Sequence, residues 1–259
     1  MVKTNTIEFA DVFEYLNRLD DESIDLAIID PPYNLDVAEW DSFENLDCFM
    51  AFTKKYLELV HRKLKKTGSL YVFNTALNSA YMLVYLQSEL KMKYQNWIVW
   101  YKKDGFSACR KKYVNNQETI LFFTKTDNYT FNYNDVREPY ESTERINAAM
   151  TKGILKNGKR WYPNPNGKLC PDIWEFTSVR LEKKEKGKTK KQVHPTPKPE
   201  KMIERMIKAS SNEGDLILDL FSGTGTTALI AKRNNRNFVG CDNNIEYIKY
   251  IERRLSDEF

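Results

Sequence analysis

One stretch near the amino end of the sequence joins a strand-like run to groups that could bind a ligand. The apolar run 24–29 is followed at once by Asp30, Pro31, Pro32 and Tyr33. Neither proline has an N–H to donate, so the strand ladder cannot continue and we expect the strand to end at Asp30. The tip of the strand then carries a carboxylate and an exposed carbonyl, which can accept hydrogen bonds, and an aromatic ring with a flat face. No histidine lies beside them in the sequence. The alternative is an ordinary turn carboxylate at Asp30.

A second stretch has the form of a nucleoside-binding turn. The predicted strand 215–221 runs into a turn that contains Gly223 and Gly225, where glycine lets a ligand approach the backbone closely. About twenty residues on, Asp242 ends the next predicted strand, a position from which an acid accepts hydrogen bonds from ribose hydroxyls. Asp219, just before the turn, disfavours a pyrophosphate and suits an amino or sulfonium cation. The pattern therefore favours adenosine joined to a positively charged amino acid over a dinucleotide. A tight turn without a ligand is the alternative.

The composition indicates one large domain, or one domain that carries a substantial insertion. The chain has 259 residues, 13% of them aromatic, and no apolar run approaches the roughly 18 residues that a spanning helix needs. The first residues are too polar for a signal peptide, so we expect a cytoplasmic protein without a membrane segment. Four well-separated cysteines and only two histidines disfavour a disulfide framework, a metal centre and a Ser-His-Asp triad. We therefore expect no bound metal.

Positive charge is concentrated in two windows. The net charge of the chain is +4, yet residues 102–112 carry five bases and one acid and residues 180–191 carry seven bases and two acids. The windows are thus +4 and +5, which leaves −5 for the remainder. Such a distribution suits a polyanionic partner. The alternative for either window is a solvated loop.

Alternating strand and helix patterns flank an irregular middle region. We expect strands at 24–30, 68–74, 94–102, 117–125, 215–221 and 237–242, and helices at about 44–65, 76–90, 199–211, 226–234 and 244–255. Residues 126–193 mix Asn, Gly, Pro and aromatic residues with no sustained period, so we expect a loop-rich insert there. The pattern predicts an α/β fold with a doubly wound, mostly parallel sheet.

The two motifs together resemble those of the β-class DNA amino-methyltransferases, which methylate adenine N6 or cytosine N4 with S-adenosylmethionine. The resemblance rests on "DPPYN", on "LDLFSGTGTT", which follows it in the chain, and on "HPTPKPEKMIERMI" at 194–207, just ahead of the cofactor strand. The central block "EPYESTERI…KGILKNGKRWYPNPNGKLC" is similar to MboII-type adenine modification methylases of restriction-modification systems. The resemblance implies a Rossmann-like methyltransferase fold. It divides the chain into a catalytic half (1–125), a target-recognition insert (126–193) and a cofactor-binding half (194–259).

This resemblance implies how the first motif would act. The amine of a flipped-out adenine would donate one N–H to Asp30 and the other to the carbonyl of Pro31, which the two prolines hold in a constant direction. Tyr33 would stack on the base. An aspartate at the first motif position favours adenine N6 over cytosine N4, which stays open as the alternative. A DNA-binding relative without turnover is a further alternative, whereas cytosine C5 chemistry is disfavoured because no Pro-Cys pair exists.

The resemblance also implies the cofactor-binding residues. Asp242 would bind ribose, Phe221 would pack near the adenosine, and His194, Thr196 and Lys198 would hold the methionine carboxylate. Asp11 and Val12 match a segment that touches the adenine edge, although the same stretch also suits the start of an amphipathic helix. The full set expected to bind the cofactor is Asp11, Val12, Asp30, His194, Thr196, Lys198, Asp219, Phe221, Ser222, Gly223, Gly225, Thr226, Asp242 and Asn243.

For a DNA methyltransferase, the partner would be double-stranded DNA. Phosphate contacts would come from the two basic windows and base contacts from the insert. The expected DNA-binding residues are Lys102, Lys103, Arg110, Lys111, Arg137, Arg145, Lys159, Arg160, Lys183 and Lys184. A separately acting restriction endonuclease and a second copy of the chain are further candidate partners that the resemblance implies.

Overall fold

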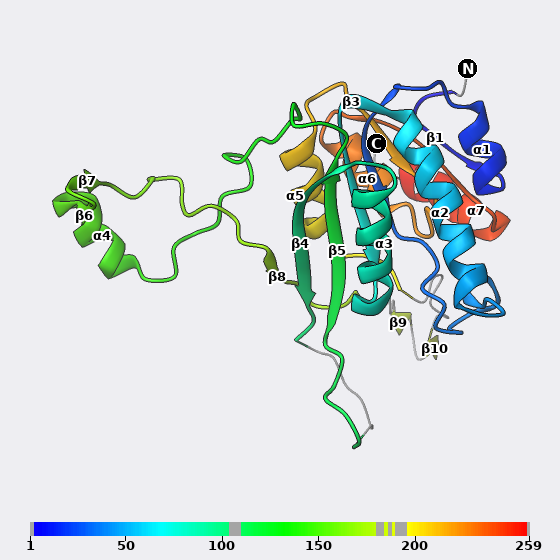
Figure 1. The fold of residues 1–259 in the computed structure, drawn as a ribbon, viewed down its shortest axis with the longest axis horizontal. Helices are drawn as coiled ribbons and strands as arrows, with labels where there is room; N and C mark the ends of the chain where they lie inside the picture. The colour runs from blue at the N-terminus through cyan, green and yellow to red at the C-terminus, as the bar shows by residue number, and fades with distance from the viewer. Residues whose placement is uncertain (1–2, 104–109, 180–183, 186–187, 190–195, 258–259) are drawn as a thin grey trace.

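One mixed, mostly parallel β-sheet organises the chain. The computed structural model describes residues 3–103, 110–179, 184–185, 188–189 and 196–257. Within these residues the main sheet has eight strands in the order β1-β12-β11-β2-β3-β5-β4-β8 (Figure 1). Their bounds, in the same order, are Thr6–Phe9, Asn237–Asp242, Leu216–Asp219, Ile24–Ile29, Leu64–Asn74, Gln117–Thr124, Lys93–Tyr101 and Ile173–Glu175.

The direction of each strand decides which loops meet at the ligand-binding edge. Strands β1, β12, β11, β2 and β3 run parallel to one another, so the loops after them leave from the same edge of the sheet. Strand β5 is antiparallel to both β3 and β4, and Thr119 near its start pairs with Asn74 at the end of β3. The start of β5 and the end of β4 therefore lie at the same edge as the carboxyl ends of β2 and β3.

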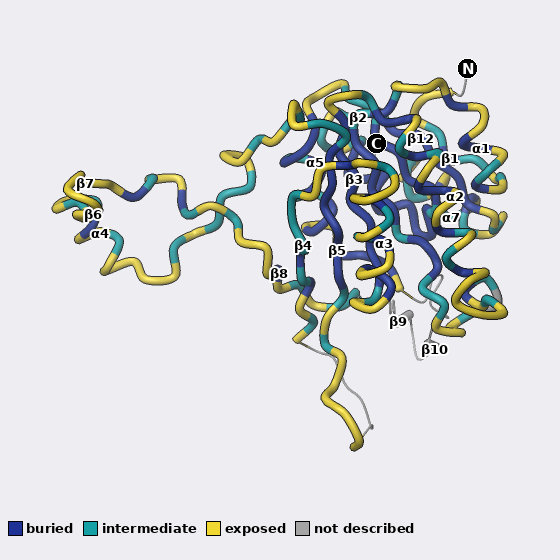
Figure 2. Tube along the Cα trace, in the orientation of Figure 1, coloured by how far each residue is buried: buried dark blue, intermediate teal, exposed yellow. Residues whose placement is uncertain are grey.

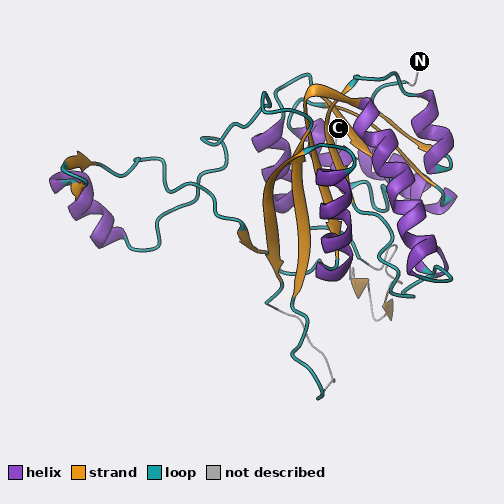
Figure 3. Ribbon diagram, in the orientation of Figure 1, coloured by secondary structure: helices purple, strands orange, loops and turns teal. Residues whose placement is uncertain are grey.

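Helices cover both faces of the sheet. Helices α1 (Val12–Arg18), α2 (Leu46–Lys63) and α3 (Ala76–Ser88) pack on one face, and α5 (Glu200–Ser210), α6 (Thr226–Arg233) and α7 (Ile245–Ser256) pack on the other (Figures 1 and 3). None of the helices in the described part of the chain has the length and apolar character needed to cross a bilayer.

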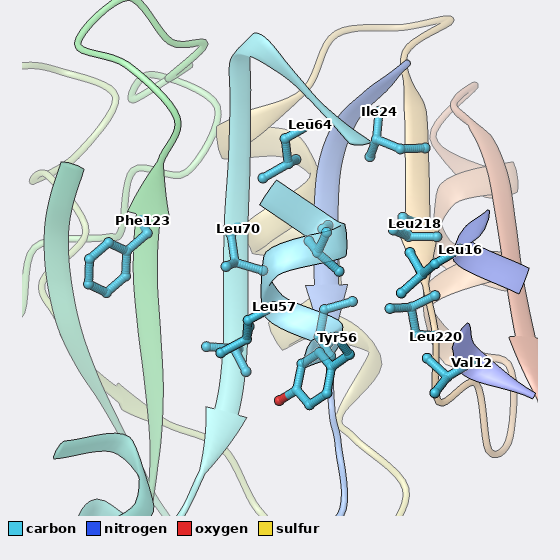
Figure 4. Packing of buried hydrophobic residues seen from close by; sticks show 14 of the residues in the cluster. Val12, Leu16, Ile24, Tyr56, Leu57, Leu64, Leu70, Phe123, Leu218 and Leu220 are labelled. Atoms are coloured by element: carbon cyan, nitrogen blue, oxygen red, sulfur yellow. The ribbon is translucent and has the colours of Figure 1, made fainter. Parts of the chain in front are cut away.

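Two buried clusters, one on each face, hold the layers together. Figure 4 shows part of the first, in which Leu16 of α1 and Tyr56 and Leu57 of α2 meet Leu70 of β3 and Leu218 of β11, all essentially inaccessible to solvent. Helix α2 presents its apolar residues at helical spacing, which is why one face of it is buried. Burial of this kind is the main favourable contribution to folding.

Local sequence explains where several helices begin. Asp11 caps α1 by accepting from the backbone N–H groups of Phe13 and Glu14, Asn45 caps α2, and Thr75 caps α3. Side-chain oxygens at these positions satisfy N–H groups that have no partner inside the helix.

The middle region contains more regular structure than the sequence indicates. It holds α4 (Thr143–Lys152), the hairpin β6 (Ile154–Lys156) and β7 (Lys159–Trp161), strand β8, and a small hairpin of β9 (Lys184–Glu185) and β10 (Lys188–Thr189). The insert is rich in loops, as expected, but these short elements within it were not predicted. Figures 1 and 2 show α4, β6 and β7 on an arm that projects beyond the β4 side of the sheet and is largely exposed. Short exposed strands of this kind carry little hydrophobic periodicity.

Most of the elements expected from periodicity are confirmed within about two residues at each end. Strand β1 was not expected, because four residues with one buried side chain give too short a pattern. The expected α/β class with a mostly parallel sheet is confirmed. The three-part division at residues 125 and 193 remains a prediction.

Gly240 allows β11 and β12 to lie close together beside the site. A Cβ atom at this position would stand 2.0 Å from the carbonyl oxygen of Asp219, its register partner. We predict that Gly240→Ala lowers the free energy of unfolding by about 1–3 kcal/mol, because an overpacked strand pair must separate. Urea unfolding monitored by circular dichroism measures this.

Gly158→Ala is the control, because its Cβ would meet nothing within 4 Å and only the positive φ of +75° opposes it. A loss at Gly240→Ala no larger than that of the control would show that the close approach is unimportant.

Candidate active site

Three carboxylates meet at the carboxyl ends of neighbouring parallel strands. Asp30 follows β2, Asp219 ends β11, and Asp242 ends β12. After β2 the chain continues on one side to β3, while β11 and β12 fill the other side. Connections therefore diverge between β2 and β11, and in open α/β sheets ligands bind at such a switch point.

A cavity of about 390 Å³ opens at this point. This volume lies within the range of small-molecule sites. Its lining combines carboxylates with aromatic and aliphatic side chains, including Phe221, Trp40 and Tyr247. A smaller hollow of about 30 Å³ continues from it along Asp219 and the glycine turn.

Asp242 is held by backbone N–H groups on both oxygens. Gly223 N–H donates to Oδ2 at 2.8 Å and Asn244 N–H donates to Oδ1 at 2.9 Å. Burial raises the pKa of this carboxyl, while the two backbone N–H donors oppose the rise. The carboxylate is thus fixed at the cavity wall, where it can accept hydrogen bonds from a diol.

Asp219 is a buried carboxyl group beside the same turn. Burial raises its pKa to about 7, although hydrogen bonds from Thr227 and from the N–H of Phe221 stabilise the charged form. A cationic ligand group beside it would favour ionisation. Together with Asp242 and the aromatic wall, Asp219 fits adenosine linked to a cation.

The glycine turn has the geometry that its sequence predicts. Gly225 is in the left-handed region at φ 71° and is the residue before α6, and Gly223 has φ 51°. The hydroxyl of Ser222 lies 3.2 Å from the carbonyl oxygens of both Asp219 and Cys241 and can donate to either one, which ties the turn to β11 and β12. Contacts within the protein therefore fix the conformation of the turn without a ligand.

Residues at the carboxyl end of β2 take part in a buried network of hydrogen bonds and ion pairs. Tyr33 Oη lies 2.9 Å from Asp30 Oδ1 and 3.0 Å from Glu118 Oε2. Lys198 Nζ lies 2.6 Å from Asp30 Oδ2 and 3.5 Å from Glu118 Oε2, and Lys102 is ion-paired with the same glutamate. The family resemblance assigns Lys198 to a ligand carboxylate, whereas here its partners are two protein carboxylates.

The loop after Tyr33 is folded around the carboxylate of Asp41. This side chain is 1% exposed and accepts from the backbone N–H groups of Tyr33 (2.5 Å), Asn34 (2.9 Å), Leu35 (2.9 Å) and Val37 (3.4 Å). A charged acceptor with four donors fixes the path of the loop, which includes a left-handed residue at Asn34. Asp41 thus fixes the position of Tyr33.

Most of the residues expected to bind a cofactor lie at the cavity or its continuation. These are Asp11, Val12, Asp30, Thr196, Lys198, Asp219, Phe221, Ser222, Gly223, Thr226, Asp242 and Asn243. Asp11 also caps α1, so the interpretation of that stretch as the start of a helix is confirmed. Gly225 does not line either hollow and packs against Ile251 instead. His194 lies outside the described residues. Which of them contact a cofactor remains a prediction.

The expected DNA-binding residues fall into three groups. Lys102, Lys103, Arg137 and Arg160 have protein partners, respectively Glu118, Glu175, the carbonyl of Gly167 and the carbonyl of Lys152. Arg110, Lys111, Arg145 and Lys159 are exposed. Lys183 lies outside the described residues, and Lys184 belongs to β9. Their contacts with DNA remain a prediction.

Several residues of the cavity were not expected from the sequence. They are Ala10, Leu35, Val37, Trp40, Asp41, Phe43, Phe52, Glu118, Leu220 and Tyr247, together with Lys102, which was expected only at DNA. Glu118 carries the one available signal, an acid near the start of a strand whose centre is apolar. No group of three or more His, Cys, Asp or Glu side chains in the described part of the chain could hold a metal ion.

Comparison with known proteins agrees with this geometry. A family model described as DNA methylase, of the N6 and N4 type, matches residues 24–253. The type II methyltransferase M1.MboII of Moraxella bovis is 53% identical over 248 residues, which cover 96% of this chain and 95% of that protein. The DNA adenine methyltransferase YhdJ of Escherichia coli (strain K12) is 34% identical and covers 98% of this chain and 83% of its own length.

The fold also matches solved structures. The crystal structure of the M1.HpyAVI–SAM complex superposes with a TM-score of 0.60 at 24% identity and covers 96% of this chain and 99% of that one. At this level of identity the likeness concerns the fold.

The Asp41 interactions can be tested without a ligand. We predict that Asp41→Ala leaves the N–H groups of Tyr33, Asn34, Leu35 and Val37 without their acceptor, which lowers stability by about 1–3 kcal/mol. These amides should exchange hydrogen much faster in the variant. Hydrogen exchange read by mass spectrometry measures this.

Asp20→Ala, at an exposed aspartate, is the matched control and should change neither quantity. Unaltered exchange at residues 33–37 in Asp41→Ala would mean that the loop keeps its path by other contacts.

Proposed function

This chain belongs to the DNA methylase family, and we propose that it transfers a methyl group from S-adenosylmethionine to the N6 amine of adenine within a specific DNA site. The observation that carries the proposal is that Asp30, at the junction of β2 and β11, lines both the cavity that contains Asp242 and the adjoining hollow that contains Asp219. One motif can hold an amine, the other fits adenosine with a cationic tail, and the cavity joins them.

The cofactor supplies, when bound, a methyl group already activated by a sulfonium. The protein therefore has no need of a strong base or a covalent nucleophile. Asp30 accepts one amine N–H and the carbonyl of Pro31 accepts the other, so that the nitrogen lone pair is directed at the methyl group. Pro31 and Pro32 are both buried, which keeps that carbonyl in place. Tyr33 lines the cavity and offers its ring to the base.

An aromatic platform at the cavity implies a base that has left the duplex. Bases inside a helix are stacked, so an enzyme that modifies the amine must turn the nucleotide outward. The arm that carries α4, β6 and β7 would contact the DNA around the target, and the exposed bases Arg110, Lys111, Arg145 and Lys159 would neutralise phosphates.

Adenine is favoured over cytosine by two observations. The first motif position is an aspartate, and a DNA adenine methyltransferase is 34% identical over nearly the whole chain. The family includes cytosine-N4 enzymes with the same set of groups, so cytosine N4 is the second candidate.

The relatives also suggest the biological setting. The chain resembles a type II methyltransferase along 96% of its length, which supports a modification enzyme of a restriction-modification system. A cognate endonuclease would then recognise the same site as a separate protein. A homodimer remains a proposal drawn from the family.

The products of the reaction test the proposal directly. We expect N6-methyladenine at one short motif when DNA from cells that express the chain is sequenced as single molecules. Mass spectrometry of digested nucleosides separates N6-methyladenine from N4-methylcytosine. A protein that binds S-adenosylmethionine and DNA but modifies neither base would support a DNA-binding relative without turnover.

The first motif can be tested by a single substitution. We predict that Asp30→Ala lowers methyl transfer by about 10²–10³-fold or more, because an acceptor aimed at the reacting amine is lost. Cofactor affinity should change little, as measured by calorimetry. Near-normal turnover in this variant would refute the mechanism. Asp20→Ala again serves as the control.

Protonation of Asp219 gives a prediction for cofactor binding. Its pKa is about 7 in the free protein, and a cationic ligand stabilises the carboxylate, so binding near neutral pH should release protons. The release should vanish well above pH 7, where Asp219 is already ionised, and in Asp219→Asn. Calorimetry in buffers of different ionisation enthalpy measures it. Proton uptake on binding would contradict this assignment.

A further inference from the structure

Four charged side chains form a continuous row behind the tip of β2. Asp30 contacts Lys198 at 2.6 Å, Lys198 contacts Glu118 at 3.5 Å, and Glu118 is ion-paired with Lys102. The hydroxyl of Tyr33 lies within hydrogen-bond distance of both carboxylates. Since a hydroxyl carries a single proton, it donates to one carboxylate at a time, and the lysines serve the remaining oxygens.

The row is assembled from segments that are distant in the sequence. Asp30 and Tyr33 follow β2, Lys102 follows β4, Glu118 lies in β5, and Lys198 precedes α5. The antiparallel direction of β5 is what brings Glu118 to the edge where β2 ends.

The row is also largely removed from water. The side chains of Lys198 and Glu118 are 8% and 12% exposed. The Lys198 ammonium lies 5.3–5.9 Å from the ring centroids of Phe73, Tyr33 and Trp100. Buried ion pairs contribute little to stability compared with apolar residues of the same size. A role in stability alone therefore does not account for the network.

The network affects the ionisation of the Asp30 carboxyl group. Burial raises the pKa of this carboxyl, the neighbouring Lys198 ammonium opposes the rise, and the Glu118 carboxylate adds to it. Tyr33, Asp219 of β11 and Tyr56 of α2 are the other titratable groups that interact with Asp30. A protonated Asp30 would offer a hydroxyl where the amine of the base needs an acceptor.

We propose that Lys198 and Glu118 are positioning residues of the transfer reaction, in which Lys198 keeps Asp30 charged and Glu118 holds Lys198 and the Tyr33 hydroxyl in place. This inference rests on the proposed function for its kinetic test. Neither residue touches the reacting amine, and both act through Asp30 and Tyr33.

Substitutions at Lys198 and Glu118 should shift the pH dependence of turnover in opposite directions. Lys198→Met removes the ammonium that opposes protonation of Asp30, so the acidic limb of the rate profile should move to higher pH. On the acidic side of the profile, turnover should fall by about tenfold for each unit by which the limb moves, and it should recover in alkaline buffer. Glu118→Gln removes a like charge but keeps an acceptor for Tyr33, so the acidic limb should move to lower pH.

Two further variants separate this role from a structural one. Lys198→Arg keeps the positive charge and should restore an acidic limb close to that of the unaltered protein. This variant also keeps the proposal testable if Lys198→Met does not fold. Lys208→Met makes the same chemical change at a half-exposed lysine of α5 and should leave the profile unaltered. A uniform loss of turnover at all pH values in Lys198→Met, without a shift of the limb, would overturn the proposal.

A second readout does not depend on catalysis. With ¹³Cγ-labelled aspartate, the Asp30 carboxyl resonance is identified by its loss in Asp30→Asn and is then followed with pH in the free protein. Its midpoint should rise in Lys198→Met and fall in Glu118→Gln. Unchanged midpoints in both variants would refute the inference even in an active enzyme. If instead the midpoints shift and no DNA is methylated, the network holds and the proposed function fails.

Discussion

The parallel pairing of β11 with β2 is the contact on which the rest of the site depends. Ile217 lies opposite Leu26 and Leu218 lies opposite Ala27, and all four side chains are buried. This register brings Asp30 at the tip of β2 beside the glycine turn after β11. Because the side chains of a strand alternate between faces, a slip of one residue would exchange the two buried clusters and separate the two motifs.

Acidic side chains gathered at one edge of the sheet repel one another when they are ionised. The protein reduces this repulsion in three ways. Asp242 receives two backbone N–H donors, Asp30 receives the Lys198 ammonium and the Tyr33 hydroxyl, and Asp219, with a pKa of about 7, is partly protonated near neutral pH. Burial raises the pKa of all three carboxyl groups, and different neighbours oppose the rise at each of them. Such perturbed pKa values are typical of functional sites.

The arm that carries α4, β6 and β7 projects from the fold but is anchored on both sides, to α5 and to the sheet. Asn132 donates to the carbonyls of Lys208 and Ser211 at the end of α5, and β8 pairs with β4. Between these anchors the arm is mostly exposed, as Figure 2 shows. Variable surface on a rigid scaffold lets one methylase fold serve many recognition sites.

The sequence by itself determined the two motifs, the alternation of strands and helices, and the family, because prolines, glycines and apolar periodicity act through local geometry. It also indicated correctly that Asp30 and Asp242 lie at strand ends and that Asp219 precedes the glycine turn. Only the tertiary structure decided that Asp41 would fold the loop after Tyr33 and that Glu118 and Lys198 would meet at Asp30. These contacts join segments far apart in the chain, and their formation depends on strand order and direction, which no local pattern encodes.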